Sequence, residues 1–346
     1  MFGRVSPFIR RPRPVPAPDS PFLTLVLTGR NDSYGGDFTD RFFRTLRFNL
    51  RQLQARAVSY ELAFVEWAPP AGATLLADQV FAAVPELEAA HCSWYVVDER
   101  YQRALSLNPH LEYLEFLAKN VGIRRARGEF VLVSNCDVFL GRRVLEVLQR
   151  HALQQGSLYR APRHDLKLAV DPSRIDWELL EDPRNLAGPA HVLKPPYMGS
   201  ATGDFVLLDR QSFHRIRGFN EIYRVARIGI DRNLLVKVLS SGLAIVDIGG
   251  PVYHVNHLGS YRLQPTAYAG REEQAHWGDR RWHQAGPSYV NPETWGLAEA
   301  PVHQRGGALH LAFDWRAVPP LVDLHRVVRP VARVGQPAPG RYVSKR

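Results

Sequence analysis

A short polar triplet, Asn135-Cys136-Asp137, directly follows an apolar run over residues 130–134 that is typical of a buried strand. In the sheets of α/β proteins, ligands bind at the carboxyl ends of the strands. A carboxylate at that edge offers the oxygen ligands that a divalent cation takes. Asp137 is therefore the first candidate for chemistry, and the alternative interpretation is an aspartate that only caps the turn after the strand.

The elements that would position this triplet alternate between strand and helix. Apolar, β-rich runs predict strands at 22–28, 60–65, 94–97 and 130–134, and helical periodicity predicts helices at 39–57, 74–84 and 111–127. This alternation predicts an α/β fold with a parallel sheet and helices on both of its faces. Thr28, Glu66, Asp98 and Asp137 then lie at the ligand-binding edge of the sheet.

The second half of the chain is less regular. The predicted strands are 157–161, 166–170, 205–208, 243–248 and 252–255, and the predicted helices are 143–154, 210–216 and 231–241, with a loop at 183–203. Asp231 stands where the last helix begins, a position at which an aspartate commonly caps a helix. Beyond residue 296 the pattern weakens.

Several short motifs follow one another in a recognisable order. They are Asn-Val-Gly at 120–122, Ala-Arg-Gly at 126–128, Asn-Cys-Asp at 135–137, a glycine-bearing loop at 199–204 and Gly-Phe-Asn at 218–220. In this order they resemble the core of the GT-A glycosyltransferases of family 2 and its relatives. The resemblance implies a Rossmann-like nucleotide-diphospho-sugar transferase fold, with a mostly parallel central sheet and a smaller acceptor-side sheet.

The same resemblance implies a division of the chain into segments. These are a Pro/Arg-rich tail at 1–21, a GT-A domain at 22–260 and a C-terminal extension with a basic tail at 261–346. Within the domain, 22–140 would form the nucleotide-sugar-binding half and 141–260 the acceptor-binding half.

A divalent metal, Mn²⁺ or Mg²⁺, is the cofactor that the resemblance implies. Asp137 would be one ligand, and a histidine at the end of a late strand, His254 or His257, would be another. Imidazole suits Mn²⁺ better than Mg²⁺. The two histidines are three residues apart, so on a strand they would face opposite sides, and we expect one of them to reach the metal. The family motif usually has aspartate in both outer places, whereas Asn135 occupies the first here.

Two carboxylates are candidates for catalysis. Asp231 resembles the acidic residue that opens the acceptor-side helix, which in inverting enzymes removes the proton of the acceptor hydroxyl. Its interpretation as a helix cap is compatible with that role. Asp204, in the glycine-bearing loop, would contact hydroxyls of the donor sugar or the acceptor.

The donor would be bound by polar residues at the strand ends. In the family, the first two of these loops hold the base and the ribose, and here they contain Thr28, Arg30, Asn31 and Glu66. Arg30 and Lys119 would meet the diphosphate. Asn120 and Asn135 complete the donor-binding set that the resemblance implies.

Composition excludes some other classes of protein. The formal net charge is +10, but residues 1–21 contain four arginines and one aspartate, and residues 316–346 contain seven basic residues and one aspartate. Basic tails fit an acidic partner or a peripheral membrane contact, whereas the body is near neutral and nucleic acid is not the expected partner. Two cysteines, Cys92 and Cys136, and no apolar run long enough for a membrane span favour a cytoplasmic protein.

The function that the sequence favours is transfer of a sugar from a nucleoside diphosphate, with a UDP-sugar preferred, to a hydroxyl of a glycan, a lipid-linked sugar or a small molecule. One alternative is a nucleotidyltransferase of the same fold, although the segment 28–36 matches its Gly-rich signature poorly. The other is a non-catalytic protein that binds nucleotides or nucleic acid with its basic tails.

Overall fold

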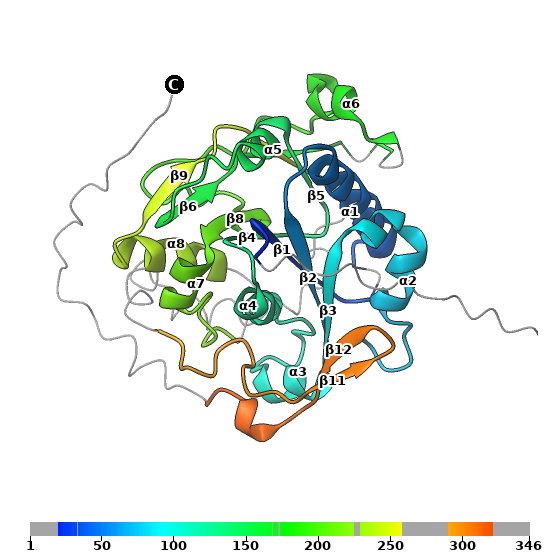
Figure 1. The fold of residues 1–346 in the computed structure, drawn as a ribbon, viewed down its shortest axis with the longest axis vertical. Helices are drawn as coiled ribbons and strands as arrows, with labels where there is room; N and C mark the ends of the chain where they lie inside the picture. The colour runs from blue at the N-terminus through cyan, green and yellow to red at the C-terminus, as the bar shows by residue number, and fades with distance from the viewer. Residues whose placement is uncertain are drawn as a thin grey trace, which may run out of the picture.

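The computed structural model describes residues 20–32, 34–167, 169–171, 174–224, 229–257 and 290–320. Within these residues a nine-stranded sheet forms the centre of the molecule, and a three-stranded sheet lies beside it (Figure 1). Most neighbouring strands of the large sheet are parallel. The predicted α/β architecture, with a mostly parallel central sheet and a smaller second sheet, is confirmed.

The centre of the large sheet comes from the first half of the chain. Its strands are β1 (Leu23–Gly29), β2 (Tyr60–Trp67), β3 (His91–Val97) and β4 (Phe130–Ser134), in the spatial order β3-β2-β1-β4. Every residue of β1, β2 and β4 is buried, as expected for parallel strands that helices cover on both faces.

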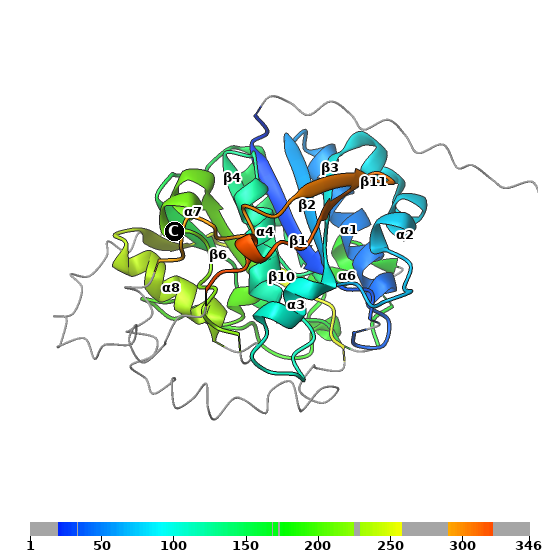
Figure 2. The same cartoon turned by 90° about the horizontal axis from the view of Figure 1, so that it is seen from below.

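Helices cover both faces of this sheet (Figures 1 and 2). One face packs against α1 (Phe38–Ala55), α2 (Leu76–Ala83) and α5 (Arg142–Gln149). The other packs against α3 (Glu99–Leu105), α4 (Glu115–Arg125), α7 (Arg210–Ile216) and α8 (Ile230–Ser240). The alternation of inward side chains along each strand therefore separates two large apolar cores.

The second half of the chain extends the large sheet and builds the small one. β8 (Phe205–Asp209) runs antiparallel to β4 and is followed in space by β6 (Ser157–Arg160) and β9 (Ala244–Asp247). The small sheet has the order β5 (Val138–Leu140), β10 (Val252–His254) and β7 (Arg163–Asp165). A short helix, α6 (Trp177–Glu181), packs near it.

Some predicted elements differ from the observed ones. The strand predicted at 166–170 is wrong, because β7 occupies 163–165 and Leu166 forms only an isolated bridge with Leu186. The helix predicted from residue 111 begins at Glu115 instead. The side chain of Gln102 explains this later start. It binds the carbonyl oxygen of Leu111 and the backbone nitrogen of Leu114, so these groups are not available for helical hydrogen bonds.

Residues 290–320, which the sequence assigns to a C-terminal extension, contribute to the central sheet. β12 (Ala308–Leu311) pairs in parallel with β3, and β11 (Val302–Arg305) pairs with β12. The weak pattern beyond residue 296 did not predict these strands. The N-terminal tail and most of the basic C-terminal tail lie outside the described residues. No helix in the described part of the chain is long and apolar enough to cross a membrane.

The glycines of the 120–128 motif allow close packing between α4 and the sheet. A Cβ atom at Gly122 would lie 2.5 Å from a side-chain carbon of Val26, and one at Gly128 would lie 2.5 Å from the backbone nitrogen of Thr24. Such contacts are far shorter than van der Waals distances. The motif therefore fixes how the chain enters β4, the strand that leads to Asp137.

Substitution of Gly128 by alanine tests this packing. We expect Gly128→Ala to lower the free energy of unfolding by about 1–3 kcal/mol, because backbone atoms of β1 cannot move aside. Gly188→Ala is the matched control, since a Cβ there meets no atom within 4 Å. Urea denaturation measures both, and equal stabilities of the two variants would contradict the assignment.

Candidate functional site

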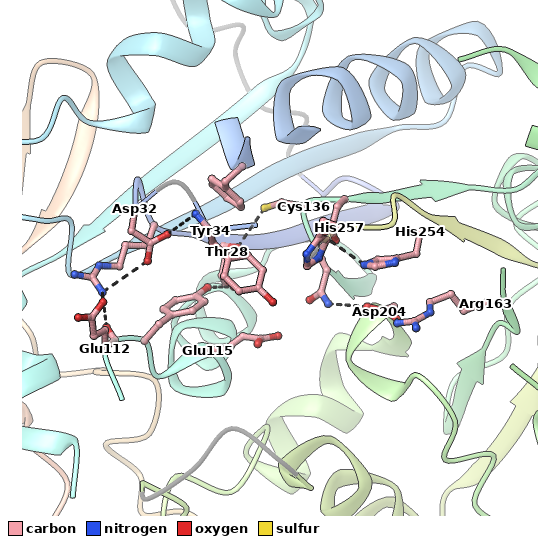
Figure 3. A pocket seen from close by; sticks show the side chains of 16 residues that line it. Thr28, Asp32, Tyr34, Glu112, Glu115, Cys136, Arg163, Asp204, His254 and His257 are labelled. Carbon is pink, nitrogen blue, oxygen red and sulfur yellow. Dashed lines mark hydrogen bonds and ion pairs between the residues drawn. The ribbon is translucent and has the colours of Figure 1, made fainter. Parts of the chain in front are cut away.

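A cavity of about 270 Å³ opens at the carboxyl ends of β1 and β4. Figure 3 shows it, with Asp32 and Glu112 at one end and Asp204, Arg163 and His254 at the other. The residues that line it are Thr28, Gly29, Arg30, Asp32, Tyr34, Phe38, Glu112, Tyr113, Glu115, Asn135, Cys136, Asp137, Arg163, Asp204, His254 and His257. Seven residues of the predicted site therefore meet in one cavity: Thr28, Arg30, Asn135, Asp137, Asp204, His254 and His257.

Asp137, His254 and His257 form a cluster with metal-ligand geometry. Their ligand atoms all lie within 4.8 Å of one another. The Nε2 atom of His257 is 3.2 Å from Oδ2 of Asp137, and that of His254 is 3.7 Å from the same oxygen. Both histidines reach the aspartate, whereas the period of a strand predicted that only one would. β10 ends at His254, so His257 lies beyond the strand and does not follow its alternation.

The small sheet brings these residues together. β10 pairs with β5 so that His254 lies opposite Val138, the residue after Asp137. The backbone nitrogen of Val255 donates a hydrogen bond to the carbonyl oxygen of Asp137 at 2.9 Å. On its other side β10 pairs with β7, and His254 lies opposite Asp165. The two pairings set His254 between Asp165 and Val138, and so next to Asp137.

The charges of the cluster are mutually stabilising. Burial alone would raise the pKa of Asp137, but the two imidazoles more than offset this and hold that pKa well below its usual range. Burial opposes protonation of His254, yet Asp137 and Asp165 raise its pKa above the usual value. Asp137 is therefore an ionised carboxylate, the form in which it can bind a cation.

A chain of polar contacts continues from the cluster along the cavity wall. Arg163 donates to Oδ2 of Asp204 at 2.6 Å, and Asn135 donates to the other oxygen of Asp204 at 2.6 Å. The oxygen of Asn135 in turn accepts from Nζ of Lys119 at 2.8 Å. Lys119 also binds Glu115 at 2.6 Å and the carbonyl of Gly203 at 3.0 Å. Both oxygens of Asp204 are thus occupied by donors.

The opposite end of the cavity is built by the loop after β1. Arg30 binds the backbone and the carboxylate of Glu112 at 3.1 and 3.0 Å. Tyr113 donates its hydroxyl hydrogen to Thr28 at 2.5 Å. The buried guanidinium of Arg41 holds the loop through the carbonyls of Tyr34 and Gly35 and the carboxylate of Asp37.

Asp231 occupies the first turn of α8 and is half-buried. Its carboxylate accepts from the backbone nitrogen of Arg232 at 2.9 Å. Burial raises its pKa above the usual range, against the attraction of Arg160 and Lys119. It is not among the residues that line the cavity, but it lies within electrostatic reach of Lys119 and Glu115 in α4.

Three residues predicted to bind the donor have other surroundings. Glu66 is fully buried and accepts from the backbone of Leu76 and from Trp94, so it caps the start of α2. Asn120 is fully buried and holds the Gly-Phe-Asn turn through both polar groups of Phe219. Asn31 donates to the carbonyl of Thr74 at 2.7 Å.

Lys119 is also fully buried and has three acceptors, so it supports the cavity wall from behind. Sequence reasoning missed Tyr34, Tyr113, Glu115, Arg163 and Asp165, which line the cavity or contact the cluster. The sequence could have indicated Tyr113 and Glu115, because they precede the predicted site residue Lys119 by one or two helical turns. Arg163 and Asp165 had no such signal, since the strand there was predicted three residues too late.

The sequence matches no model of a known protein family and no curated protein. Among solved structures, the fold is similar to that of GalNAc-T7 crystallised with UDP, GalNAc and Mn²⁺. This likeness has a TM-score of 0.45 and 9% identity, and covers 69% of this chain but only 44% of that one. A second similar structure is assigned as a glucose-1-phosphate thymidylyltransferase from Bacillus anthracis, in complex with a sucrose. There the TM-score is 0.40 and the identity 11%, over 72% of this chain and 96% of that one. What the protein does is therefore inferred from its own side chains.

The buried ion pair behind the cavity gives a testable prediction. Lys119→Met should lower the free energy of unfolding by about 3 kcal/mol, because it leaves Glu115 and Asn135 without their cation. The control is Arg103→Met, which removes an exposed pair of the same i,i+4 spacing with Glu99 and should cost less than about 1 kcal/mol. Similar losses in the two variants, measured by chemical denaturation, would show that the Lys119 pair is not a buried support.

Proposed function

We propose that the protein is a metal-dependent glycosyltransferase of the GT-A type, which transfers a sugar from a nucleoside diphosphate to an acceptor hydroxyl. The observation that carries this proposal is the convergence of Asp137, His254 and His257 in a cavity at the carboxyl edge of a mostly parallel sheet. That edge is where α/β folds bind nucleotides. A UDP-sugar is the preferred donor.

The residues present fit a divalent cation. One carboxylate and two imidazoles line the same cavity, with ligand atoms that all lie within 4.8 Å of one another and could hold a cation together. This mixture of oxygen and nitrogen ligands favours Mn²⁺ over Mg²⁺. When bound there, the cation would neutralise the negative charge that develops on the leaving diphosphate.

The donor's nucleoside fits the opposite end of the cavity. Thr28, Arg30 and Tyr113 offer hydroxyls, a cation and an aromatic ring there, and the ring of Tyr34 lies nearer the cluster, 5.1 Å from that of His257. A second, open cavity of about 600 Å³ shares Arg30 and Glu112 with the first. The combined space suits a nucleotide-sugar better than the first cavity alone, since ligand sites typically measure about 300–1,000 Å³.

The acceptor would be activated by Asp231. A carboxylate whose pKa is raised by burial is a stronger base than an exposed one, and Asp231 has such a pKa. We infer direct displacement with inversion. Asp204 would contact hydroxyls of the donor sugar or the acceptor from the cavity wall, where Asn135 and Arg163 hold its carboxylate in place. The acceptor itself would be a glycan, a lipid-linked sugar or a small molecule, and the basic tails would allow a peripheral membrane contact.

The competing functions have less support. A nucleotidyltransferase needs basic side chains in the loop after β1 to meet a triphosphate. Here the segment 28–36 matches the Gly-rich signature of those enzymes poorly, and Arg41 is buried beneath the loop. A structural cation site is typically closed, whereas Asp137, His254 and His257 line a cavity. We therefore place glycosyl transfer first.

Replacement of the central carboxylate tests the metal site. We expect Mn²⁺ and UDP together to raise the melting temperature of the unaltered protein, since a ligand at about 100 times its Kd stabilises the fold by about 2.7 kcal/mol. Asp137→Ala should abolish the Mn²⁺-dependent part of that shift. Asp98→Ala is the control, because it removes another strand-end carboxylate that does not line the cavity. Fluorimetry with UDP, GDP, dTDP and CMP, each with and without Mn²⁺, Mg²⁺ and Zn²⁺, gives the comparison. An unchanged Mn²⁺ response in Asp137→Ala would rule out the proposed ligand.

The variant Asp231→Asn tests the role of Asp231 as the base independently of donor binding. We expect this variant to bind Mn²⁺ and UDP as before but to transfer sugar about 10²–10⁴-fold more slowly, because the amide cannot accept the proton. Asp182→Asn, which removes a half-buried carboxylate that does not line the cavity, is the charge-matched control. The measurement is single-turnover transfer from the donor that the thermal screen identifies. Full turnover in Asp231→Asn would exclude it as the base.

A further inference from the structure

One carboxylate outside all of the sequence motifs, that of Asp165, lies directly behind the cluster of Asp137, His254 and His257. Asp165 ends β7 and stands opposite His254 in the pairing of β7 with β10. Its Oδ1 atom is 2.9 Å from Nδ1 of His254. The histidine is therefore in contact with two carboxylates, Asp137 at Nε2 and Asp165 at Nδ1.

This arrangement decides which nitrogen of His254 is available to a cation. A neutral imidazole has one N–H donor and one nitrogen with a free electron pair. A carboxylate can only accept, so Asp165 places the hydrogen on Nδ1. The electron pair is then on Nε2, the atom that faces Asp137 and the cavity.

Asp165 is itself held in place by two other side chains. Arg163 contacts both of its oxygens, Nε to Oδ1 at 3.1 Å and Nη2 to Oδ2 at 3.2 Å. His191 reaches Oδ2 at 2.9 Å from the segment that follows α6. Arg163 thus holds the carboxylate of Asp165 through one hydrogen bond from Nη2 and an ion-pair contact at Nε. The same arginine holds Asp204, so one side chain connects the support of the metal ligand to the cavity wall.

We propose that Asp165 is the positioning residue of the metal site: it orients His254 and presents its Nε2 to the cation. The inference rests on the metal site of the proposed function. It assigns Asp165 a role through His254, without contact between Asp165 and the metal. Such partners typically change metal affinity about 10–100-fold when they are replaced.

The test uses Asp165→Asn in the full-length protein. The amide has the shape of the carboxylate, but its NH₂ group can donate to Nδ1 and so force the hydrogen onto Nε2. We expect the Kd for Mn²⁺, measured by titration of the free-ion electron paramagnetic resonance signal, to rise about 10–100-fold. The electron spin-echo modulation from imidazole nitrogen should fall from the level of two histidines to that of one. His254→Ala gives the reference spectrum for one histidine.

Two further variants keep the test decisive. Glu181→Gln removes one negative charge from an exposed pair with Arg142 and should leave the Mn²⁺ affinity unchanged. Asp165→Ser, whose side chain is too short to reach His254, should weaken Mn²⁺ binding as Asp165→Asn does, and it replaces that variant if the latter does not fold. Unchanged affinity and unchanged nitrogen modulation in either folded variant would overturn the inference while the proposed function stands. No Mn²⁺ binding by the unaltered protein would overturn both.

Discussion

The pairing register of the small sheet is the constraint on which the rest of the site depends. Val138, His254 and Asp165 stand in one row across β5, β10 and β7. A slip of one residue in β10 would turn His254 to the opposite face of the sheet and move Asp165 away from it. The register is held by apolar contacts, because Phe139 and Tyr253 pack with Leu166 and Leu180 in a separate small core. Packing of apolar residues outside the cavity therefore determines whether Asp137 and His254 come together.

The presence of an asparagine at position 135 has a physical explanation in the polar wall of the cavity. Its side-chain nitrogen donates to Asp204 and its oxygen accepts from Lys119. An amide can do both at once, whereas an ionised carboxylate can only accept. An aspartate there would bring two carboxylates to about hydrogen-bond distance, which costs free energy in a buried place. Because of the asparagine, hydrogen-bond donors and acceptors alternate along the cavity wall from Glu115 to Asp165.

The sequence predicted the centre of the fold and part of the site. Buried parallel strands are nearly continuous apolar runs, so β1, β2 and β4 and the edge that contains Asp137 were found from pattern alone. Burial of Glu66 and Asn120 could not be predicted, because a polar residue at a strand end or in a helix has the same sequence signal whether it caps a turn or binds a ligand. β11 was missed because all of its residues are exposed, so it has no apolar alternation. The contact of His257 with Asp137 depends on where β10 stops, which periodicity does not give.

The strand pair β11–β12 has a practical consequence for work with fragments of this chain. β12 pairs with the end of β3, from Tyr95 to Val97, and the buried aromatic rings of Trp94 and Tyr95 lie on that strand. A fragment that stops at residue 260, the boundary that motif content indicates, would leave this side of the sheet open as a template for other chains. Low solubility of such a fragment would then be explained by an uncovered strand edge, and would not show that residues 22–260 are unable to fold.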